Sequence, residues 1–456
     1  MAEYLSPGVY VEEFDSGSKP MEGVGTSTAG FIGLAERGPI EGLPQLVTNF
    51  SDFKRKYGGY LSENEFGEYR FLAYAVEHFF INGGARCYIS RVAPSDAKCA
   101  SAHIPSENKA ALVLTAKNPG MWGNNIRAVI SPASKAKTQV LEIVENASGK
   151  KYVVKNGSGF QPGDIVSFTD GKKTSYNRVV KNQDNLLEFE KEFEADVVDK
   201  NLVPKKLIST CEFTLEVRYD DLAEVYENVS FNIEAPNYIE KKTAKSELIT
   251  AACAGAGSEL LAPFDELAAE GDAVVSVSFT GGSNGSVASL SAADFIGYDN
   301  GASRRSGIQS FLDNDVVSIM AVPGITDPNV QLTLVAHCEN LGSRFAVLDM
   351  PRDAKKVDDI LAHRDILDSS YAALYHPWLQ VFDPLDKKNF AIPPSGSIMG
   401  IYARSDNSRG VHKAPANEVV RACVGLDCQF NKGEQDILNP QGVNLIRSFT
   451  GRGIRV

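Results

Sequence analysis

The sequence has little of what membrane-spanning and secreted proteins need. Its apolar runs, such as residues 316–325, are much shorter than the ~20 residues of a membrane-spanning helix. The N-terminus has neither the basic end nor the apolar stretch of a signal peptide, because Glu3, Pro7 and Glu12 fall in those places. We therefore expect a chain that folds in the cytoplasm and makes no direct contact with a membrane.

Positive charge is also scarce. The chain carries 46 lysines and arginines against 58 aspartates and glutamates, a formal net charge of −12. Proteins that bind nucleic acids usually present a basic patch that neutralises phosphates, so this balance argues against direct nucleic-acid binding. The length of 456 residues predicts roughly two to four domains, and a hydrophobic content of 43% is sufficient for a large core.

Metal-binding patterns are missing from the sequence. The seven cysteines are scattered, and Cys423 and Cys428 are the only near pair, with no second pair or histidine cluster beside them. None of the six histidines lies at ligand spacing from another. The cysteines are therefore predicted to be buried free thiols, and no metal ion or other cofactor is expected.

Catalytic motifs are missing as well. The sequence contains no G-x-x-x-x-G-K-[ST] phosphate loop, no G-x-S-x-G elbow and no H-E-x-x-H motif. Four aspartates near predicted strand ends are placed as in an α/β active site, although loop capping is the commoner role of such residues. They are Asp349, Asp353, Asp383 and Asp386. We expect no enzyme activity, and an α/β enzyme with a β insertion is kept as the alternative.

What the sequence does contain begins with a short strand. Val9, Tyr10 and Val11 form an alternating segment after a Pro-Gly turn. Residues 14–28 are rich in Gly, Ser and Glu and have little to bury. We predict a strand on a flexible leash with two possible positions. It adds to the sheet of a neighbouring copy, or it pairs as an edge strand of its own domain.

An α/β pattern follows this arm and returns near the C-terminus. Residues 29–34 are predicted to be a buried strand, Ser51 to cap a helix ending at Tyr57, and residues 70–81 to form a helix with one apolar face. Residues 86–92 are predicted to be a strand. Three later parallel strands are expected at residues 316–323, 345–350 and 373–379. The helices that connect them are expected at residues 332–340 and 357–367.

Between these two stretches the pattern is mostly β. The predicted fold class is therefore an α/β (α+β) core domain with an inserted β-rich outer region and a flexible N-terminal strand arm. The predicted units are the arm at 1–22, the first part of the core at 23–100, and the second part at 273–456. The β-rich insertion is expected at 101–272, with a small β module at about 146–204.

Several segments occur in an order that is specific to one family. Residues 6–13 read SPGVYVEE, residues 26–39 read TSTAGFIGLAERGP, and residues 79–92 read FFINGGARCYISRV. Residues 118–125 read NPGMWGNN, and residues 280–285 read TGGSNG. Together they resemble the sheath subunit of contractile tails, a family found in contractile-tailed phages, R-type bacteriocins and phage-like contractile injection systems.

The most specific match to this family is the segment 375–419, which contains PWLQVFDP and then IPPSGSIMGIYARSDNSRGVHKAPANEVV. The resemblance implies a structural role for its motif residues, which are Pro393, Pro394, Gly396, Gly410, His412, Lys413, Pro415 and Asn417. In the family, the final G-R-G-I-R-V element usually leads into a C-terminal arm. Either this sequence is a piece of a longer chain, or this sheath lacks that arm.

The resemblance implies a structural sheath subunit, with the core facing an inner tube and the β-rich region facing outward. Copies would stack as six-fold rings around the tube, and contraction would drive the tube through a target envelope. The implied partners are other copies, an inner tube protein, and baseplate and tail-terminator or cap proteins. Assembly is expected in the bacterial cytoplasm, as part of a phage virion tail or another contractile particle. A static shell or surface-layer protein is a further alternative, and it predicts one lattice state instead of two.

Overall fold

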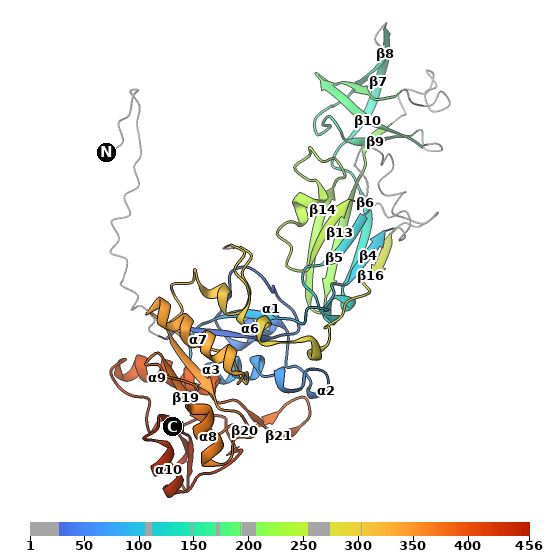
Figure 1. Ribbon diagram of the computed structural model, residues 1–456. Helices are drawn as coiled ribbons and strands as arrows, with labels where there is room; N and C mark the ends of the chain where they lie inside the picture. Colours follow the sequence, from blue (N-terminus) through green and yellow to red (C-terminus); the bar gives the residue numbers. More distant parts are fainter. Residues whose placement is uncertain are drawn as a thin grey trace, which may run out of the picture.

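The computed structural model describes residues 27–104, 112–146, 149–169, 174–191, 193, 207–253, 274–301 and 303–456. Over these residues the protein is a mixed α/β molecule with two parts. Figure 1 shows an α/β body from which a β-rich part extends. The predicted arm residues Val9, Tyr10 and Val11 lie outside the described residues. Within the described residues, no helix has the length and apolar character needed to cross a membrane.

A seven-stranded sheet forms the centre of the body. Its order is β2 (Gln45–Val47), β3 (Cys87–Val92), β1 (Ala29–Leu34), β17 (Ile319–Ala321), β18 (Phe345–Asp349), β19 (Ala372–His376) and β23 (Val443–Leu445). All neighbours are parallel except β2 and β3. Every residue of β1 is buried, as expected of a parallel strand covered on both faces. The β1–β17 pair joins segments almost 300 residues apart, so both ends of the described chain share this sheet.

Helices cover both faces of this sheet. On one face, α1 (Phe50–Tyr57), α3 (Leu72–Asn82) and α9 (Ser395–Arg409) pack with Phe31 in one hydrophobic cluster. On the other face, α6 (Ala292–Ile296), α7 (Pro328–Leu341) and α8 (Val357–Arg364) pack with Ile32. Successive residues of a strand point to opposite faces, so β1 contributes to both clusters.

The remaining body elements are α2 (Glu63–Phe66), η1 (Gly67–Tyr69), η4 (Val287–Ser289), η5 (Gly307–Phe311), β20 (Leu379–Asp383), β21 (Lys388–Ile392), β22 (Gly425–Leu426), α10 (Lys432–Leu438), β24 (Arg447–Phe449) and β25 (Gly453–Arg455).

The β-rich part contains two open sheets and a closed barrel. One sheet orders β14 (Leu222–Val229), β13 (Glu212–Tyr219), β6 (Arg127–Ala133) and β16 (Val275–Ser278), and the other orders β15 (Ile249–Cys253), β5 (Leu112–Ala116) and β4 (Ser101–Ile104). The barrel orders β10 (Thr174–Gln183), β11 (Leu186–Phe189), β8 (Gly149–Val154), β7 (Lys137–Asn146), β12 (Leu207–Thr210) and β9 (Ile165–Thr169). Short helices here are η2 (Met121–Asn125) and α4 (Ile239–Thr243).

The structure extends the expected limits of this part in two places. Strand β16 pairs with β6, so β pairing continues past residue 272, where the sequence pattern placed the end of the insertion. The barrel strands run from Lys137 to Thr210, a wider span than the expected 146–204. The division of the chain into independent domains stays a prediction.

Two local expectations were wrong. The cap of α1 is Asn49 and not Ser51, because the Asn49 side chain accepts a hydrogen bond of 2.8 Å from the Asp52 amide. The strand expected at 373–379 ends at His376. Pro377 follows it and has no N–H for a strand ladder, and the chain then begins the separate strand β20.

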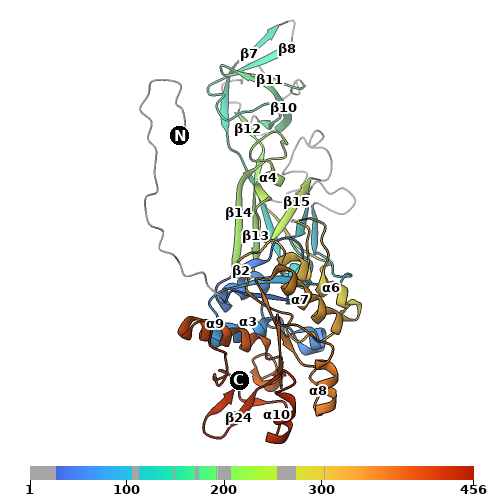
Figure 2. The ribbon, with the colours of Figure 1, turned by 60° about the vertical axis from the view of Figure 1, so that its left-hand side comes forward.

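A short neck joins the body to the β-rich part, and we define it as residues 93–100 and 279–286. Backbone bridges pair Lys98 with Ser283 and Ser101 with Thr280. Arg91 lies buried at its base and donates to the carbonyl oxygens of Ala35 (3.0 Å), Glu36 (3.2 Å), Gly38 (2.8 Å) and Pro119 (2.8 Å). Burial lowers the pKa of Arg91 to about 10, which leaves the guanidinium charged at neutral pH. Figure 2 shows this connection from another side.

Candidate assembly surface

The motif residues around the Pro-Pro-Ser-Gly segment begin helix α9. Pro394 is the N-cap residue, and its side chain makes no capping bond. Asp349, at the end of β18, takes that role by accepting hydrogen bonds from the Ser395 amide (2.8 Å), the Ser395 hydroxyl (2.7 Å) and the Gly324 amide (3.0 Å). The carboxylate therefore ties the helix start to the sheet. Burial outweighs these hydrogen bonds and raises the pKa of Asp349 to about 6.

Helices α9 and α3 pack at unusually short range, and Figures 1 and 2 both place them side by side. A Cβ atom added to Gly396 would lie 2.5 Å from the Cα atom of Ala75, and one added to Gly400 would lie 2.8 Å from the Cβ atom of Asn82. Real Cβ atoms essentially never approach this closely. Because residues four apart share one helix face, both glycines are required by the same contact.

Polar side chains fix the register of the two helices. His78 of α3 lies 3.3 Å from the Ser397 hydroxyl through its Nδ1 atom, and burial lowers its pKa to about 4. At the other end of the interface, Arg404 donates to the Asn82 carbonyl oxygen (2.9 Å) and the Val419 carbonyl oxygen (2.8 Å). Arg404 thus connects α3, α9 and the segment after α9.

The second motif, residues 410–417, forms the turn that leaves α9. Gly410 ends the helix at a φ of 91°, a conformation that favours glycine. His412 is exposed, whereas Lys413 and Pro415 are half-buried. The Lys413 ammonium lies 2.8 Å from the Glu418 carboxylate. Asn417 has a φ of 61°, which asparagine tolerates better than most residues.

The turn positions a small antiparallel sheet at the C-terminal end of the sequence. Strands β24 and β25 pair with each other. The segment after Asn417 lies along β25, because the Asn417 amide donates to the Val456 carbonyl oxygen (2.7 Å) and the Val420 amide to the Ile454 carbonyl oxygen (2.9 Å). Within the described residues, no strand pairs with the outer edge of β24. That edge offers backbone groups to another strand.

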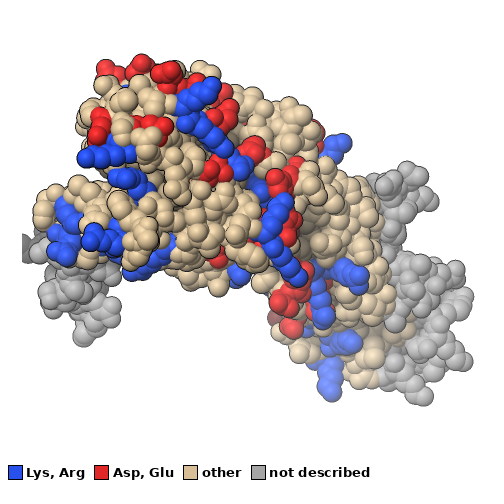
Figure 3. All heavy atoms as spheres, turned by 90° about the horizontal axis from the view of Figure 1, so that it is seen from below, with Lys and Arg blue, Asp and Glu red and all other residues tan. Residues whose placement is uncertain are grey.

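Apolar side chains are exposed near this small sheet. Val411 is 65% exposed and Val424 is 63% exposed, and Val419 and Phe449 are also exposed. Figure 3 shows the molecule from below, where basic and acidic side chains lie interspersed among large uncharged areas. Exposed apolar side chains beside an unpaired strand edge are typical of an interaction site. We call the surface formed by α9, residues 410–424 and β24–β25 the candidate assembly surface.

The aspartates that could have marked an active site do not converge. Asp349 is used as a helix cap, and buried Asp383 pairs with Arg70 (3.1 Å) and accepts from the Tyr74 hydroxyl (2.9 Å). Asp353 and Asp386 are exposed. In the part of the chain that the structure describes, no group of three His, Cys, Asp or Glu side chains is arranged to hold a metal ion.

One Cys–His contact was not foreseen from the sequence. The Cys428 thiol lies 3.6 Å from His376 Nε2. Burial raises the pKa of Cys428 to about 11 and lowers that of His376 to about 4. Both groups are therefore neutral near pH 7, whereas a reactive cysteine needs a thiolate. The contact is a weak hydrogen bond between packed side chains.

A cavity of about 520 Å³ lies beside the carboxyl ends of β17 and β18, where an α/β enzyme would hold its substrate. Arg352, Asp353, Lys355 and Trp378 contribute to its wall. Arg352 and Lys355 both lie near the Asp427 carboxylate, at 3.4 and 3.8 Å. Asp349 is absent from the wall, so the strand-end carboxylate with the raised pKa does not serve this cavity.

Sequence reasoning missed several residues of the assembly surface. Gly400, Asn82 and Arg404 hold the α3–α9 contact, but the sequence analysis did not predict that this segment packs against α3. The spacing of Gly396 and Gly400, four residues apart on a helix, was the available signal for close helix packing. No comparable signal marks Asn82, whose partners are 322 and 339 residues away in sequence.

Comparison with known proteins assigns the C-terminal third of the chain. Residues 306–456 match the family model described as the phage tail sheath protein central domain. These residues include α9, both motifs and the β24–β25 sheet. The resemblance to tail sheath proteins, predicted from residues 375–419, is thus confirmed over residues 306–456.

Individual relatives carry the same description. The tail sheath protein of Salmonella phage ViI is 26% identical over 178 residues, covering 33% of this chain and 27% of the relative. The match therefore spans about a quarter of that relative's length. Two solved sheath tail proteins are also similar, one from Listeria innocua and one from Desulfitobacterium hafniense.

The structural alignments cover most of this chain, but their sequence identities and TM-scores are low. The Listeria innocua protein aligns with 94% of this chain and 67% of its own at 10% identity and a TM-score of 0.49. The Desulfitobacterium hafniense protein aligns with 98% of this chain and 74% of its own at 12% identity and a TM-score of 0.47.

Proposed function

We propose that this chain is the sheath subunit of a contractile tail or contractile injection system. Copies stack as six-membered rings around an inner tube, and contraction drives the tube through a target envelope. The observation that carries the proposal is the family match over residues 306–456. These residues include all of the candidate assembly surface, which is formed by α9, residues 410–424 and β24–β25. The proposed role is structural and needs no catalysis.

The geometry of the assembly surface supports this role in a specific way. Contraction requires neighbours to change their relative angle without separating. A strand on a leash satisfies both needs, because backbone pairing holds the neighbour while the leash accommodates a new angle. The outer edge of β24 is an acceptor for such a strand, and Val9, Tyr10 and Val11 are the proposed donor.

The energy source in this proposal is the lattice itself. Copies assembled in a metastable extended arrangement release free energy when they move to a more stable one, so no nucleotide is consumed. Close packing of α3 against α9 supports a body that moves as a rigid unit while the N-terminal arm changes its angle to the neighbouring copy. By resemblance, the body faces the tube and the β-rich part points outward. The other proposed partners are baseplate and tail-terminator or cap proteins, met during assembly in the bacterial cytoplasm or within the particle.

Deleting residues 1–13 tests the proposed donor strand. We expect the deleted chain to remain folded but to form no ordered tubes, because the neighbour's strand edge stays empty. The matched control replaces residues 14–22 with a Gly-Ser segment of equal length, which keeps the strand and should preserve the tubes. Negative-stain electron microscopy shows whether tubes form, and circular dichroism shows whether the deleted chain is folded. Normal tubes from the deleted chain would refute the arm assignment.

A further inference from the structure

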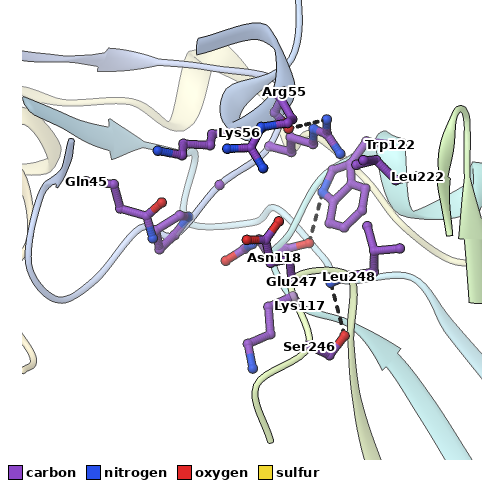
Figure 4. A pocket seen from close by; sticks show the side chains of 13 residues that line it. Gln45, Arg55, Lys56, Lys117, Asn118, Trp122, Leu222, Ser246, Glu247 and Leu248 are labelled. Atoms are coloured by element: carbon purple, nitrogen blue, oxygen red, sulfur yellow. Dashed lines mark hydrogen bonds between the residues drawn. The ribbon is translucent and has the colours of Figure 1, made fainter. Parts of the chain in front are cut away.

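A positively charged pocket lies where the body meets the β-rich part (Figure 4). Its volume is about 240 Å³. Four cationic side chains contribute to its wall, and Glu247 is the one acidic residue among those that line it. The cations are Arg37, Arg55, Lys56 and Lys117. They come from the loop after β1, from α1 and from the loop after β5, so both parts of the molecule contribute.

Arg37 is the most unusual member of this group. It is only 9% exposed, and a guanidinium buried to this degree needs hydrogen-bond acceptors or an anion to offset the loss of hydration. Its guanidinium carbon lies 4.6 Å from the centre of the Tyr219 ring, and its Nη2 atom donates to the Lys54 and Arg55 carbonyl oxygens. Among the described residues, no ion pair joins Arg37 to a carboxylate, and its buried Nε atom has no acceptor. Carbonyl oxygens and aromatic rings thus contact the Arg37 guanidinium, but in the described part of the chain no carboxylate does.

The neighbouring cations are only partly neutralised. Arg55 and Lys56 share one carboxylate, that of Asp52, at 2.9 and 3.1 Å. Lys117 is exposed at the opposite wall. Figure 4 shows Arg55 and Lys56 on one side of the pocket and Lys117 and Glu247 on the other. Four cations and one carboxylate line the pocket, an excess of positive charge that favours a divalent anion over a monovalent one.

We propose that this pocket binds a small divalent oxyanion of the phosphate type. The anion lies between the Arg37 guanidinium and the Lys117 ammonium group and is held by the charges of both. The volume is below the range of pockets that hold larger organic ligands, which favours a small ion. Because the binding groups come from the body and from the loop after β5, the bound anion fastens the two parts to each other. This inference is independent of the proposed sheath function.

Titration of the full-length chain with inorganic phosphate tests the proposal. Isothermal titration calorimetry at constant ionic strength should give saturable binding to one site per chain, weaker at higher salt. Acetate, a monovalent oxyanion, should bind at least about tenfold more weakly because it carries half the charge. Trp122 lines the pocket, so phosphate should also change the tryptophan fluorescence.

Two lysine variants localise the site. Lys117→Gln removes an exposed cation that lines the pocket and should weaken phosphate binding about three- to tenfold. Lys54→Gln removes an exposed cation of α1 that does not line it, and should leave the affinity unchanged. Both positions are exposed, so both variants should fold. An absence of saturable binding, equal affinities for phosphate and acetate, or equal effects of the two variants would each overturn the proposal.

Discussion

The body and the β-rich part are built on different principles. The body depends on single positions that no other residue type can occupy, such as Gly396 and Gly400 between two helices. The β-rich part depends on alternating strands around aromatic side chains, with Tyr152, Phe168 and Phe193 in mutual contact inside the barrel. Many apolar residues satisfy an alternating pattern, whereas a backbone contact of this kind admits only glycine.

The family match falls within one of these two parts. The matched residues 306–456 all lie in the body and contain α9 with its cap Asp349, whereas α3 and the rest of residues 27–92 lie outside the match. The β-rich part lies outside the match. The proposed function predicts that the body carries the contacts between copies.

The largest expected effect comes from opening an equivalent cavity in each part. Phe79→Ala in the body and Phe168→Ala in the barrel each remove a fully buried ring and should each cost about 3–5 kcal/mol. The first should abolish tube formation, whereas the second should loosen only the barrel. Hydrogen exchange by mass spectrometry locates the loss of protection, and electron microscopy scores the tubes. Loss of tubes in both variants would contradict the proposal that the body, and not the barrel, mediates tube formation.

A smaller effect is expected from adding one methyl group between α3 and α9. Gly396→Ala forces the new Cβ against the Ala75 backbone and should destabilise the chain by about 1–3 kcal/mol. Gly59→Ala is the matched control, because no atom lies within 4 Å of its Cβ position. Urea denaturation measures both. Equal stabilities of the two variants would show that the helices separate at little cost.

The dependence of stability on pH should be set largely by the body. The folded state holds the proton of Asp349 up to a pKa of about 6, so this residue contributes stability at low pH that is lost as the pH rises through about 6. His78, His337 and His376 have pKa values lowered to about 4, so their contribution is lost as the pH falls below about 6.5. The two trends oppose each other between about pH 4 and 6.

Asp349→Asn removes the pH-dependent contribution of Asp349 to stability and leaves that of the three histidines. Its stability should therefore fall more steeply on acidification than that of the unmodified chain, by up to about 1.4 kcal/mol per pH unit in this range. Urea denaturation at several pH values between about 4 and 7 measures the difference. Parallel stability curves for the two proteins would contradict the raised pKa of Asp349.

The smallest effect on stability, but a selective one on assembly, is expected from surface charges. Val411→Glu combined with Val424→Glu places charge on the candidate assembly surface, and Val225→Glu places it on an exposed position of β14. Each change should alter stability by less than about 0.5 kcal/mol. Only the first pair should reduce tube formation, as measured by sedimentation. If the β14 variant fails equally, the β-rich part is also an assembly surface.

The sequence predicted those elements whose signal is local. The strand at 29–34 was predicted with its observed bounds, and α3 and β18 were predicted to within two residues, because apolar runs and turn residues delimit them. The parallel pairing of β17, β18 and β19 also followed from the alternation of strands and helices. The cap of α1 and the break before Pro377 were misjudged because competing local signals lay within two residues.

What the sequence could not predict depends on distant partners. Closure of the barrel requires β12 to pair with both β7 and β9, and nothing local to residues 207–210 specifies those neighbours. The buried role of Asp349 likewise depends on Ser395, 46 residues later. The cationic pocket combines Arg37 with residues of α1 and the loop after β5, and only the three-dimensional structure brings these segments together.

Electron microscopy of the native particle that contains this chain tests the central proposal most directly. The account predicts hollow cylinders of stacked six-fold rings in two lengths, with the α/β body of each copy toward the tube and strands exchanged between neighbours. A single lattice state, or copies that remain monomers in every preparation, would contradict it.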